Sequence, residues 1–302
     1  MYMKKLIFNI SILALLLILL LNPQTTLSGS ISGLTLWYKA ILPSLLPFMI
    51  ISNFIVQYDL TETISTIMRP LTYILKLDKR AGYCIFAGLF FGFPACATTA
   101  ISMYNRKHID AHTANICIMS FNNISPAFLS GYICIAILKN TRYLPVIFGI
   151  HYGTILLNSI FVRYIIMKNR PYYDEIYSNT NESNLTDGPV ISGIKNISKL
   201  GVYIMLFSIL SQYLQKLPII FTPYLCGIFE ITTGINAISE SIHNSALLLV
   251  IIMPFITFGG ICGILQTFAV DTASLIEKRK YLISRLSAIA ICSMLSLIFF
   301  LM

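Results

Sequence analysis

One carboxylate stands inside an apolar stretch of this 302-residue chain, at Glu230 in the sequence FEITTG. The other eleven Asp and Glu residues lie in polar stretches or at the ends of apolar ones. A charged carboxylate at the centre of a bilayer costs at least about 2.5 kcal/mol, which makes such a residue a candidate functional group. Glu230 could bind a proton, a cation or a substrate hydroxyl. The structural alternative is that it accepts hydrogen bonds from the backbone donors of a turn.

Residues that break helices interrupt three more apolar stretches. They are Gly-Phe-Pro at 92–94, Asn-Asn-Ile-Ser-Pro at 122–126 and Gly-Gly at 259–260. Proline removes a backbone donor, and glycine permits unwinding. Within a bilayer, non-helical backbone is tolerated only where it is buried in protein or lines a water-filled cavity. The interruptions therefore predict a cavity, and kinked helices packed through small residues are the alternative.

A helix that starts after such a turn directs its free N–H groups, and the positive end of its dipole, toward the turn. These ends can bind anionic or polar groups, and threonine hydroxyls nearby add donors unless they bond their own backbone. We predict that the substrate-binding residues are Gly92, Pro94, Thr98, Thr99, Asn122, Asn123, Ser125, Glu230, Thr232, Thr233, Gly259, Gly260 and Gln266.

The composition places these residues in a membrane protein. The chain is 56% apolar and only 11% charged, whereas a soluble domain carries about a quarter charged residues. Several apolar runs exceed the roughly 18 residues that indicate a membrane-spanning helix. The net charge of +9 comes with no RNA- or DNA-binding motif, so we expect the lipid bilayer and a small-molecule substrate as partners, and no nucleic acid. The positive net charge fits cytoplasmic loops rich in Lys and Arg.

Eight apolar segments follow the N-terminal one, at about 35–57, 82–104, 112–137, 143–167, 200–215, 219–239, 246–270 and 281–301. We predict that the second and the sixth are re-entrant hairpins, which turn at Gly92–Pro94 and around Glu230. An arm of about eleven residues reaches only about 16 Å, half of the hydrocarbon core. A re-entrant second segment keeps the basic pairs at 79–80 and 106–107 on one side of the membrane.

With both hairpins in place, seventeen of the twenty-one Lys and Arg residues face the cytoplasm, as does the N-terminus. Arg163 and Arg285 are expected at inner helix ends. Four basic residues face outward: Lys39, Lys139, Arg142 and Lys216. The asymmetry agrees with the positive-inside rule, which also guided the choice of map.

The predicted fold is an all-α polytopic membrane protein with an inverted repeat. Two gate-like halves, 35–167 and 200–302, each contain a helix, a re-entrant hairpin, a broken helix and a helix. Each half crosses the membrane three times, so the second is inverted, as in many secondary transporters. A polar cytoplasmic linker, 168–199, joins the halves. Residues 1–34 are assigned to one extra N-terminal transmembrane helix and an outer loop; this helix could be a cleaved signal peptide, but an uncleaved helix is favoured.

Metal and disulfide chemistry are not expected. The seven cysteines all lie in apolar segments, form no C-x-x-C pair and are odd in number, so we interpret them as small buried apolar residues. His108 and His112 could share a helix face, but Asp110 is the only nearby acidic residue, and we predict no metal site. The stretch 61–77 has the mixed polarity of a helix lying at the membrane surface.

Four motifs together resemble one family. GFPACATTAISMYNRKHIDAHTA, NNISPAFLSG, FEITTG and FGGICGILQTFAVD are similar in kind and spacing to the YlbJ-like sporulation integral membrane proteins. That family belongs to the nucleoside-recognition (gate) group, which is distantly like the concentrative nucleoside transporters. The resemblance covers the chain from about residue 35. This chain has Gly92-Phe-Pro94 where the family usually has Gly-Tyr-Pro, and Cys262 where a serine is common.

The resemblance implies a role in endospore formation, in the bacterial inner membrane of the cell or the forespore, with dipicolinate as the proposed substrate. We therefore expect a secondary transporter of a small polar or anionic metabolite, with dipicolinate favoured. The alternatives are a non-transporting assembly or scaffold protein of the spore envelope and a nucleoside-type transporter. No enzyme motif is present, and we expect neither catalysis nor a cofactor. A coupling proton or cation, and a homo-oligomer, are left open.

Overall fold

The computed structural model describes residues 13, 16–17, 19–58, 60–168, 188–216, 221–271 and 274–301, and these ranges contain helices and no strand. Four helices are long and apolar enough to cross a membrane: Thr141–Ile166, Pro189–Gln215, Ser245–Ala269 and Lys278–Phe300. Two shorter apolar helices are Leu46–Gln57 and Phe128–Ile137. The prediction of an all-α membrane protein is confirmed.

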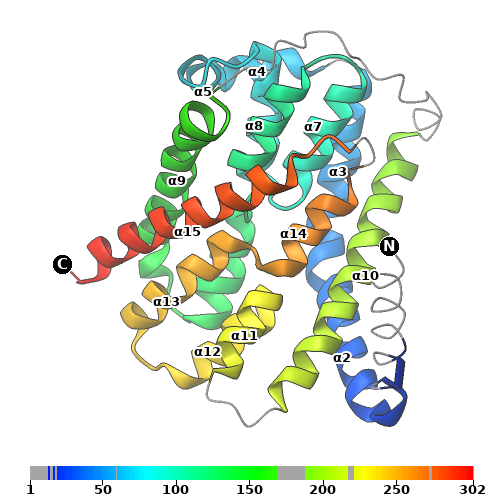
Figure 1. Ribbon diagram of the computed structural model, residues 1–302, viewed down its shortest axis with the longest axis vertical. Helices are drawn as coiled ribbons and strands as arrows, with labels where there is room; N and C mark the ends of the chain where they lie inside the picture. The colour runs from blue at the N-terminus through cyan, green and yellow to red at the C-terminus, as the bar shows by residue number, and fades with distance from the viewer. Residues whose placement is uncertain are drawn as a thin grey trace, which may run out of the picture.

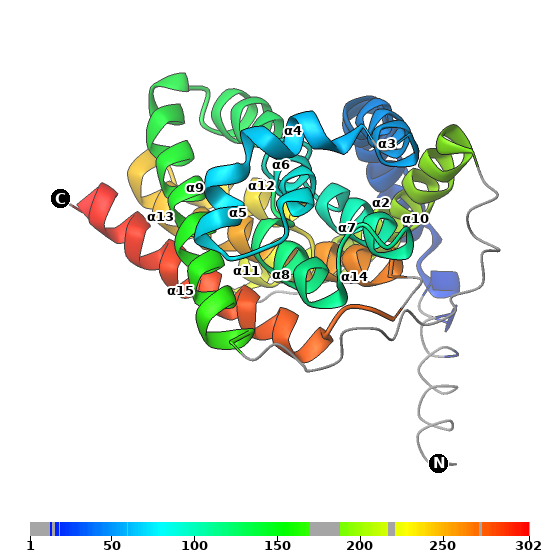
Figure 2. The ribbon, with the colours of Figure 1, turned by 90° about the horizontal axis from the view of Figure 1, so that it is seen from above.

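The first long helical element runs through α2 (Pro23–Leu36), η1 (Trp37–Ile41) and α3 (Leu42–Gln57). Its backbone stays helical at both junctions. The element packs along α10 (Pro189–Gln215), and Figures 1 and 2 show the two side by side. The outer loop expected before residue 35 is thus helical. Most of the N-terminal apolar segment lies outside the described residues.

Small residues bring α2 close to α10. A Cβ added at Gly29 would lie 2.6 Å from the Cα of Ile209, and one added at Gly33 would lie 2.7 Å from the Cα of Met205. These two glycines form a G-x-x-x-G pattern, which lets helix backbones approach closely in a membrane. On the same interface, the Trp37 indole N–H donates to the carbonyl of Ile197 at 3.0 Å.

The helix α10 begins at Pro189, so the last part of the expected linker 168–199 is helical. Residues 169–187 of that linker lie outside the described part of the chain. Two short helices, α4 (Thr61–Ile67) and α5 (Arg69–Ile74), lie at one end of the molecule (Figure 1), where Ile67, Tyr73 and Ile74 are exposed. They lie within the stretch 61–77, whose predicted position at the membrane surface stays a prediction.

The first hairpin consists of α6 (Gly82–Phe90) and α7 (Ala95–Asn105), which pack against each other across a turn. At the turn, Gly92 has φ +82 and the Phe93–Pro94 peptide bond is cis. A left-handed φ is readily adopted only by glycine, which explains the glycine at this position. At 1.5 Å per residue each arm is about 14–16 Å long, about half of a hydrocarbon core. The turn lies where the sequence predicted it.

The first broken helix consists of α8 (Ala111–Phe121) and η3 (Phe128–Ile137), with non-helical backbone from 122 to 125. Asp110 caps α8, since its carboxylate accepts a hydrogen bond from the N–H of Thr113 at 2.6 Å. The helix that follows the break is a continuous element made of η4 (Thr141–Tyr143), α9 (Leu144–Phe161) and η5 (Val162–Ile166).

The second half has the same order of elements. After α10, α11 (Thr222–Phe229) and α12 (Ile231–Ser241) form a hairpin with Glu230 at its tip. Its arms cross very closely, because a Cβ added at Gly234 would lie 2.1 Å from the Cα of Gly227. The second broken helix is α13 (Ser245–Phe258) and α14 (Gly260–Ala269), and α15 (Lys278–Leu301) follows. Both predicted breaks are confirmed.

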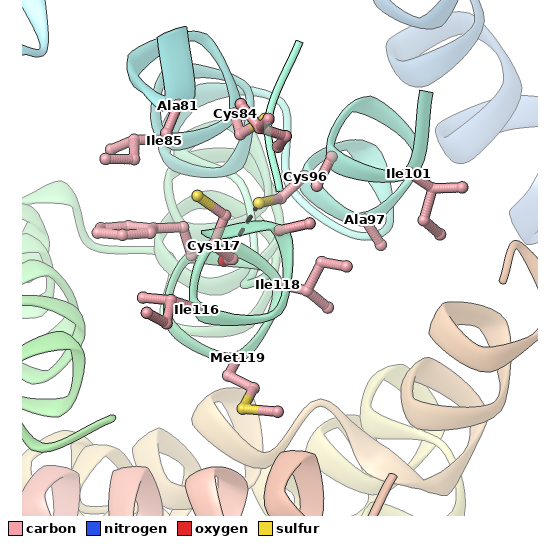
Figure 3. Packing of buried hydrophobic residues seen from close by; sticks show 14 of the residues in the cluster. Ala81, Cys84, Ile85, Cys96, Ala97, Ile101, Ile116, Cys117, Ile118 and Met119 are labelled. Atoms are coloured by element: carbon pink, nitrogen blue, oxygen red, sulfur yellow. Dashed lines mark hydrogen bonds between the residues drawn. The ribbon is translucent and has the colours of Figure 1, made fainter. Parts of the chain in front are cut away.

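The hairpins approach each other from opposite ends of the molecule. In Figure 1, α7 of the first hairpin lies in the upper part, whereas α11 and α12 of the second lie in the lower part. Around the first hairpin, alanine, cysteine, isoleucine and methionine side chains pack in the core between α6, α7 and α8 (Figure 3). In this cluster the Cys96 thiol donates to the carbonyl of Cys117 at 3.3 Å. All seven cysteines are buried and free, in agreement with the prediction that they serve as small apolar residues.

Candidate functional site

All four interruptions of the chain meet at one cavity of about 440 Å³. The first hairpin tip contributes Phe91, Gly92 and Phe93, and the break after α8 contributes Ile124 and Ser125. The second tip contributes Glu230, Ile231 and Thr232, and the second break contributes Gly259. The remaining lining residues lie in helices: Leu36, Ile41, Ala127, Phe128, Gly131, Tyr132, Ala136, Leu200, Ile204, Cys262, Gly263 and Gln266. Ligand sites commonly enclose about 300–1,000 Å³, so this volume suits a small metabolite.

Glu230 carries the one charge on the cavity wall, and its carboxylate caps α12. One oxygen, Oε1, accepts a hydrogen bond from the backbone N–H of Thr232 at 3.0 Å and another from its hydroxyl. The other oxygen accepts from the N–H and the hydroxyl of Thr233, both at 2.7 Å. The side chain is only 5% exposed. Four donors therefore stabilise the carboxylate at the wall of the cavity. Glu230 thus has the structural role given above as the alternative, since it accepts hydrogen bonds from the backbone donors of a turn.

The first hairpin tip fits tightly against both breaks. A Cβ added at Gly92 would lie 2.8 Å from the backbone N of Ser125, and one added at Gly259 would lie 2.8 Å from the ring of Phe93. Gly259 also has φ +79, a left-handed conformation that glycine adopts without strain. The ring of Phe93 thus packs directly on the second break.

The break after α8 is held by side chains from three other helices. The carbonyl of Asn122 accepts a hydrogen bond from Arg285 Nη2 at 2.8 Å, and the carbonyl of Ile124 lies 3.2 Å from His151 Nε2. The amide of Asn122 donates to the Thr267 hydroxyl at 2.8 Å. Unwound backbone leaves carbonyls without helical partners, and buried polar groups need partners. These side chains supply them.

The thirteen residues predicted to bind substrate divide into two groups. Six line the cavity: Gly92, Ser125, Glu230, Thr232, Gly259 and Gln266. The other seven are not on its wall: Pro94, Thr98, Thr99, Asn122, Asn123, Thr233 and Gly260. Among them, the Thr98 hydroxyl donates to the carbonyl of Ala95, and the Thr99 hydroxyl lies 3.1 Å from that of Ser52. Asn122 and Asn123 are buried behind the wall.

Arg285 corrects one expectation. We predicted it at an inner helix end, but it is 1% exposed and lies in α15 beside the break after α8. Its Nη1 donates to Asn123 Oδ1 at 2.8 Å. The signal that could have found it is the Asn-Asn pair, because carbonyl and amide oxygens in an unwound segment need a buried donor.

Within the described ranges, no group of three or more His, Cys, Asp or Glu side chains could hold a metal ion. Comparison with family models gives no match, and no solved structure matches either. A curated protein does match: the sporulation integral membrane protein YlbJ of Bacillus subtilis (strain 168) is 22% identical over an alignment that covers 88% of this chain and 75% of YlbJ.

The chain is a distant relative of YlbJ. The name of that relative and the four apolar helices together identify an integral membrane protein that is related to a sporulation protein. The similarity extends over both hairpins and both breaks, since it covers 88% of the chain.

Proposed function

We propose that the protein is a secondary transporter that binds a small polar or anionic metabolite in the cavity between the two hairpin tips and the two breaks. One observation carries this proposal: four interruptions, from segments far apart in the sequence, line a single cavity inside an apolar helical protein. Broken helices around a central site are the way in which secondary transporters place backbone polar groups at the bilayer midplane.

The repeated order of elements supports an inverted repeat within this proposal. Helix, hairpin, broken helix and helix occur twice, as α3 to η5 and as α10 to α15. With the second half inverted, the hairpins enter from opposite faces and the N-terminus lies in the cytoplasm. The relationship to YlbJ supports the bacterial inner membrane as the location.

Dipicolinate is our first candidate substrate, and a role in sporulation goes with it. A planar dianion of this size fits the volume of the cavity. A neutral, nucleoside-like solute is the second candidate, and a specific observation favours it: the described wall has aromatic rings from Phe91, Phe93, Phe128 and Tyr132 but no cationic side chain. The two candidates differ in charge, so they can be separated by experiment.

Uptake into proteoliposomes tests the function. The purified protein is reconstituted, and uptake of labelled dipicolinate and of labelled uridine is measured with and without proton or sodium gradients. The informative variant is Gly131→Phe. Gly131 lines the cavity, and a Cβ added there meets nothing within 4 Å, so a phenylalanine can be placed at this part of the wall without a backbone clash.

The matched control is Gly149→Phe. Gly149 lies in α9 away from the cavity wall, and its added Cβ also meets nothing within 4 Å. We expect Gly131→Phe to abolish uptake of the transported solute and Gly149→Phe to keep it. Absence of uptake of either solute by the unmodified protein would favour the scaffold alternative, and equal uptake by both variants would contradict the position of the site.

A further inference from the structure

Arg285 is a fully buried cation, and within the described residues its contacts are with neutral groups. Nη1 and Nη2 donate to Asn123 Oδ1 and to the carbonyl of Asn122, and Nε, also buried, has no hydrogen-bond partner. The remaining contacts are two aromatic rings, with Phe93 and Tyr281 centroids 5.4 and 4.9 Å from the guanidinium carbon.

A guanidinium group carries a permanent positive charge. Removing such a charge from water costs several kcal/mol, and buried charges are normally paired with an opposite charge. No described carboxylate forms an ion pair with Arg285, and Glu230 uses its carboxylate oxygens on its own hairpin. Arg285 therefore has no opposite charge beside it among the described residues.

The ring of Phe93 separates this charge from the cavity. Phe93 lines the cavity wall and packs on Gly259, and the same ring lies beside Arg285. The neighbouring segment 124–125 lines the cavity as well, so Arg285 lies directly behind the wall at the first tip and the first break. A carboxylate in the cavity could reach the guanidinium once the Phe93 side chain turned away.

We propose that Arg285 is the anion-binding residue of the transporter, and that the Phe93 side chain covers it until a carboxylate of the substrate displaces the ring. The inference deepens the proposed function, on which it rests, by assigning the substrate to the class of carboxylate anions. Arginine is suited to this task because its planar fork can donate two parallel hydrogen bonds to a carboxylate. It also explains how a cavity with one acidic side chain on its wall could accept an anion.

Binding to the purified protein in detergent tests the inference without transport. The probes are dipicolinate, which is a dianion at neutral pH, and its neutral diamide, which has the same shape. The variant Arg285→Gln keeps an amide donor for the carbonyl of Asn122 but loses the charge, and Arg285→Lys keeps the charge but loses the fork. Isothermal titration gives the Kd of each probe for each variant.

We expect Arg285→Gln to weaken dipicolinate binding by at least about tenfold, because one partner of a buried charge pair is lost. Diamide binding should stay within a factor of about two, and Arg285→Lys should fall between. A residue that only holds the break in place would lower the affinity for both probes equally. Equal loss of the two probes, or no dipicolinate binding by the unmodified protein, overturns the inference.

A second variant keeps the test decisive if Arg285→Gln does not fold. Phe93→Ala removes the cover and is expected to tighten dipicolinate binding by about threefold or more, which is a small change in free energy. Phe93→Leu keeps an apolar cover and should change the dipicolinate affinity little. Unchanged dipicolinate affinity in Phe93→Ala counts against the cover. Uptake assays separate the two proposals: uptake of neutral solutes alone refutes the inference, and charge-dependent binding without any uptake refutes the transport function.

Discussion

Glu230 offers the most direct test of how the second hairpin tip is stabilised. In the variant Glu230→Ala, the backbone N–H groups of Thr232 and Thr233 lose their acceptors at the start of α12, where Thr232 is buried and Thr233 is half-buried. Each buried donor left without a partner costs about 1–3 kcal/mol. The two threonine hydroxyls can turn to backbone carbonyls, so they add little. We expect the free energy of unfolding to fall by about 2–4 kcal/mol.

Glu230→Gln retains one acceptor oxygen, and the expected loss is about half as large, roughly 1–2 kcal/mol. The control is Glu240→Ala near the other end of α12, where the exposed carboxylate accepts one hydrogen bond from Asn236 at 2.9 Å. Exposed substitutions of this kind change stability by about 0.5 kcal/mol or less.

Unfolding in detergent, followed by circular dichroism over a denaturant series, gives the three values. If Glu230→Ala unfolds at the same denaturant concentration as Glu240→Ala, the carboxylate does not cap α12 and the reasoning is refuted. Uptake is then measured for Glu230→Gln, which is the milder variant. Undiminished uptake by this variant would show that the carboxylate has no part in substrate binding.

Three further predictions follow from other contacts. Gly33→Leu should lower the free energy of unfolding by about 3 kcal/mol or more, because the new side chain meets the backbone of α10, whereas Gly149→Leu in the same thermal-unfolding assay should stay close to the unmodified protein. Asn123→Ala should cost about 1.5–3 kcal/mol, since Arg285 loses a charged hydrogen bond, and a melting temperature equal to that of the unmodified protein would contradict this. A cysteine placed at 93 should react with a water-soluble thiol reagent faster than the buried Cys117; equal rates would mean that water does not reach the cavity.

The interruptions could be predicted from the sequence because each depends on local residue types. Gly92 and Gly259 adopt left-handed backbone conformations that other residues avoid. In the segment from Asn122 to Pro126, the proline lacks a backbone donor, and the Asn and Ser side chains compete for the hydrogen bonds of the backbone. These effects act within a few residues, so a single sequence carries them. The order of helices, hairpins and breaks follows from them.

The partners of the interrupted segments could not be predicted in the same way. Arg285 and His151 meet the break after α8 from two other helices, and nothing near them in the sequence marks the contact. The count of basic residues under the positive-inside rule even placed Arg285 at an inner helix end. The close packing of Gly29 and Gly33 on α10 likewise depends on a partner face that is known only from the fold.

The two sides of the cavity differ in how their hydrogen bonds are distributed along the chain. At the second tip, the acceptor Glu230 and the donors of Thr232 and Thr233 belong to four consecutive residues, so these bonds persist if the α11–α12 hairpin shifts as one piece. One longer bond, from the Tyr132 hydroxyl to the carbonyl of Thr232 at 2.7 Å, ties this tip to η3. At the break after α8, the bonds run to α9, α14 and α15, and any relative shift of those helices breaks them. Of the hydrogen bonds named here, a shift of the α11–α12 hairpin as one piece would therefore break one, whereas a shift of α9, α14 and α15 against α8 would break all three at the break.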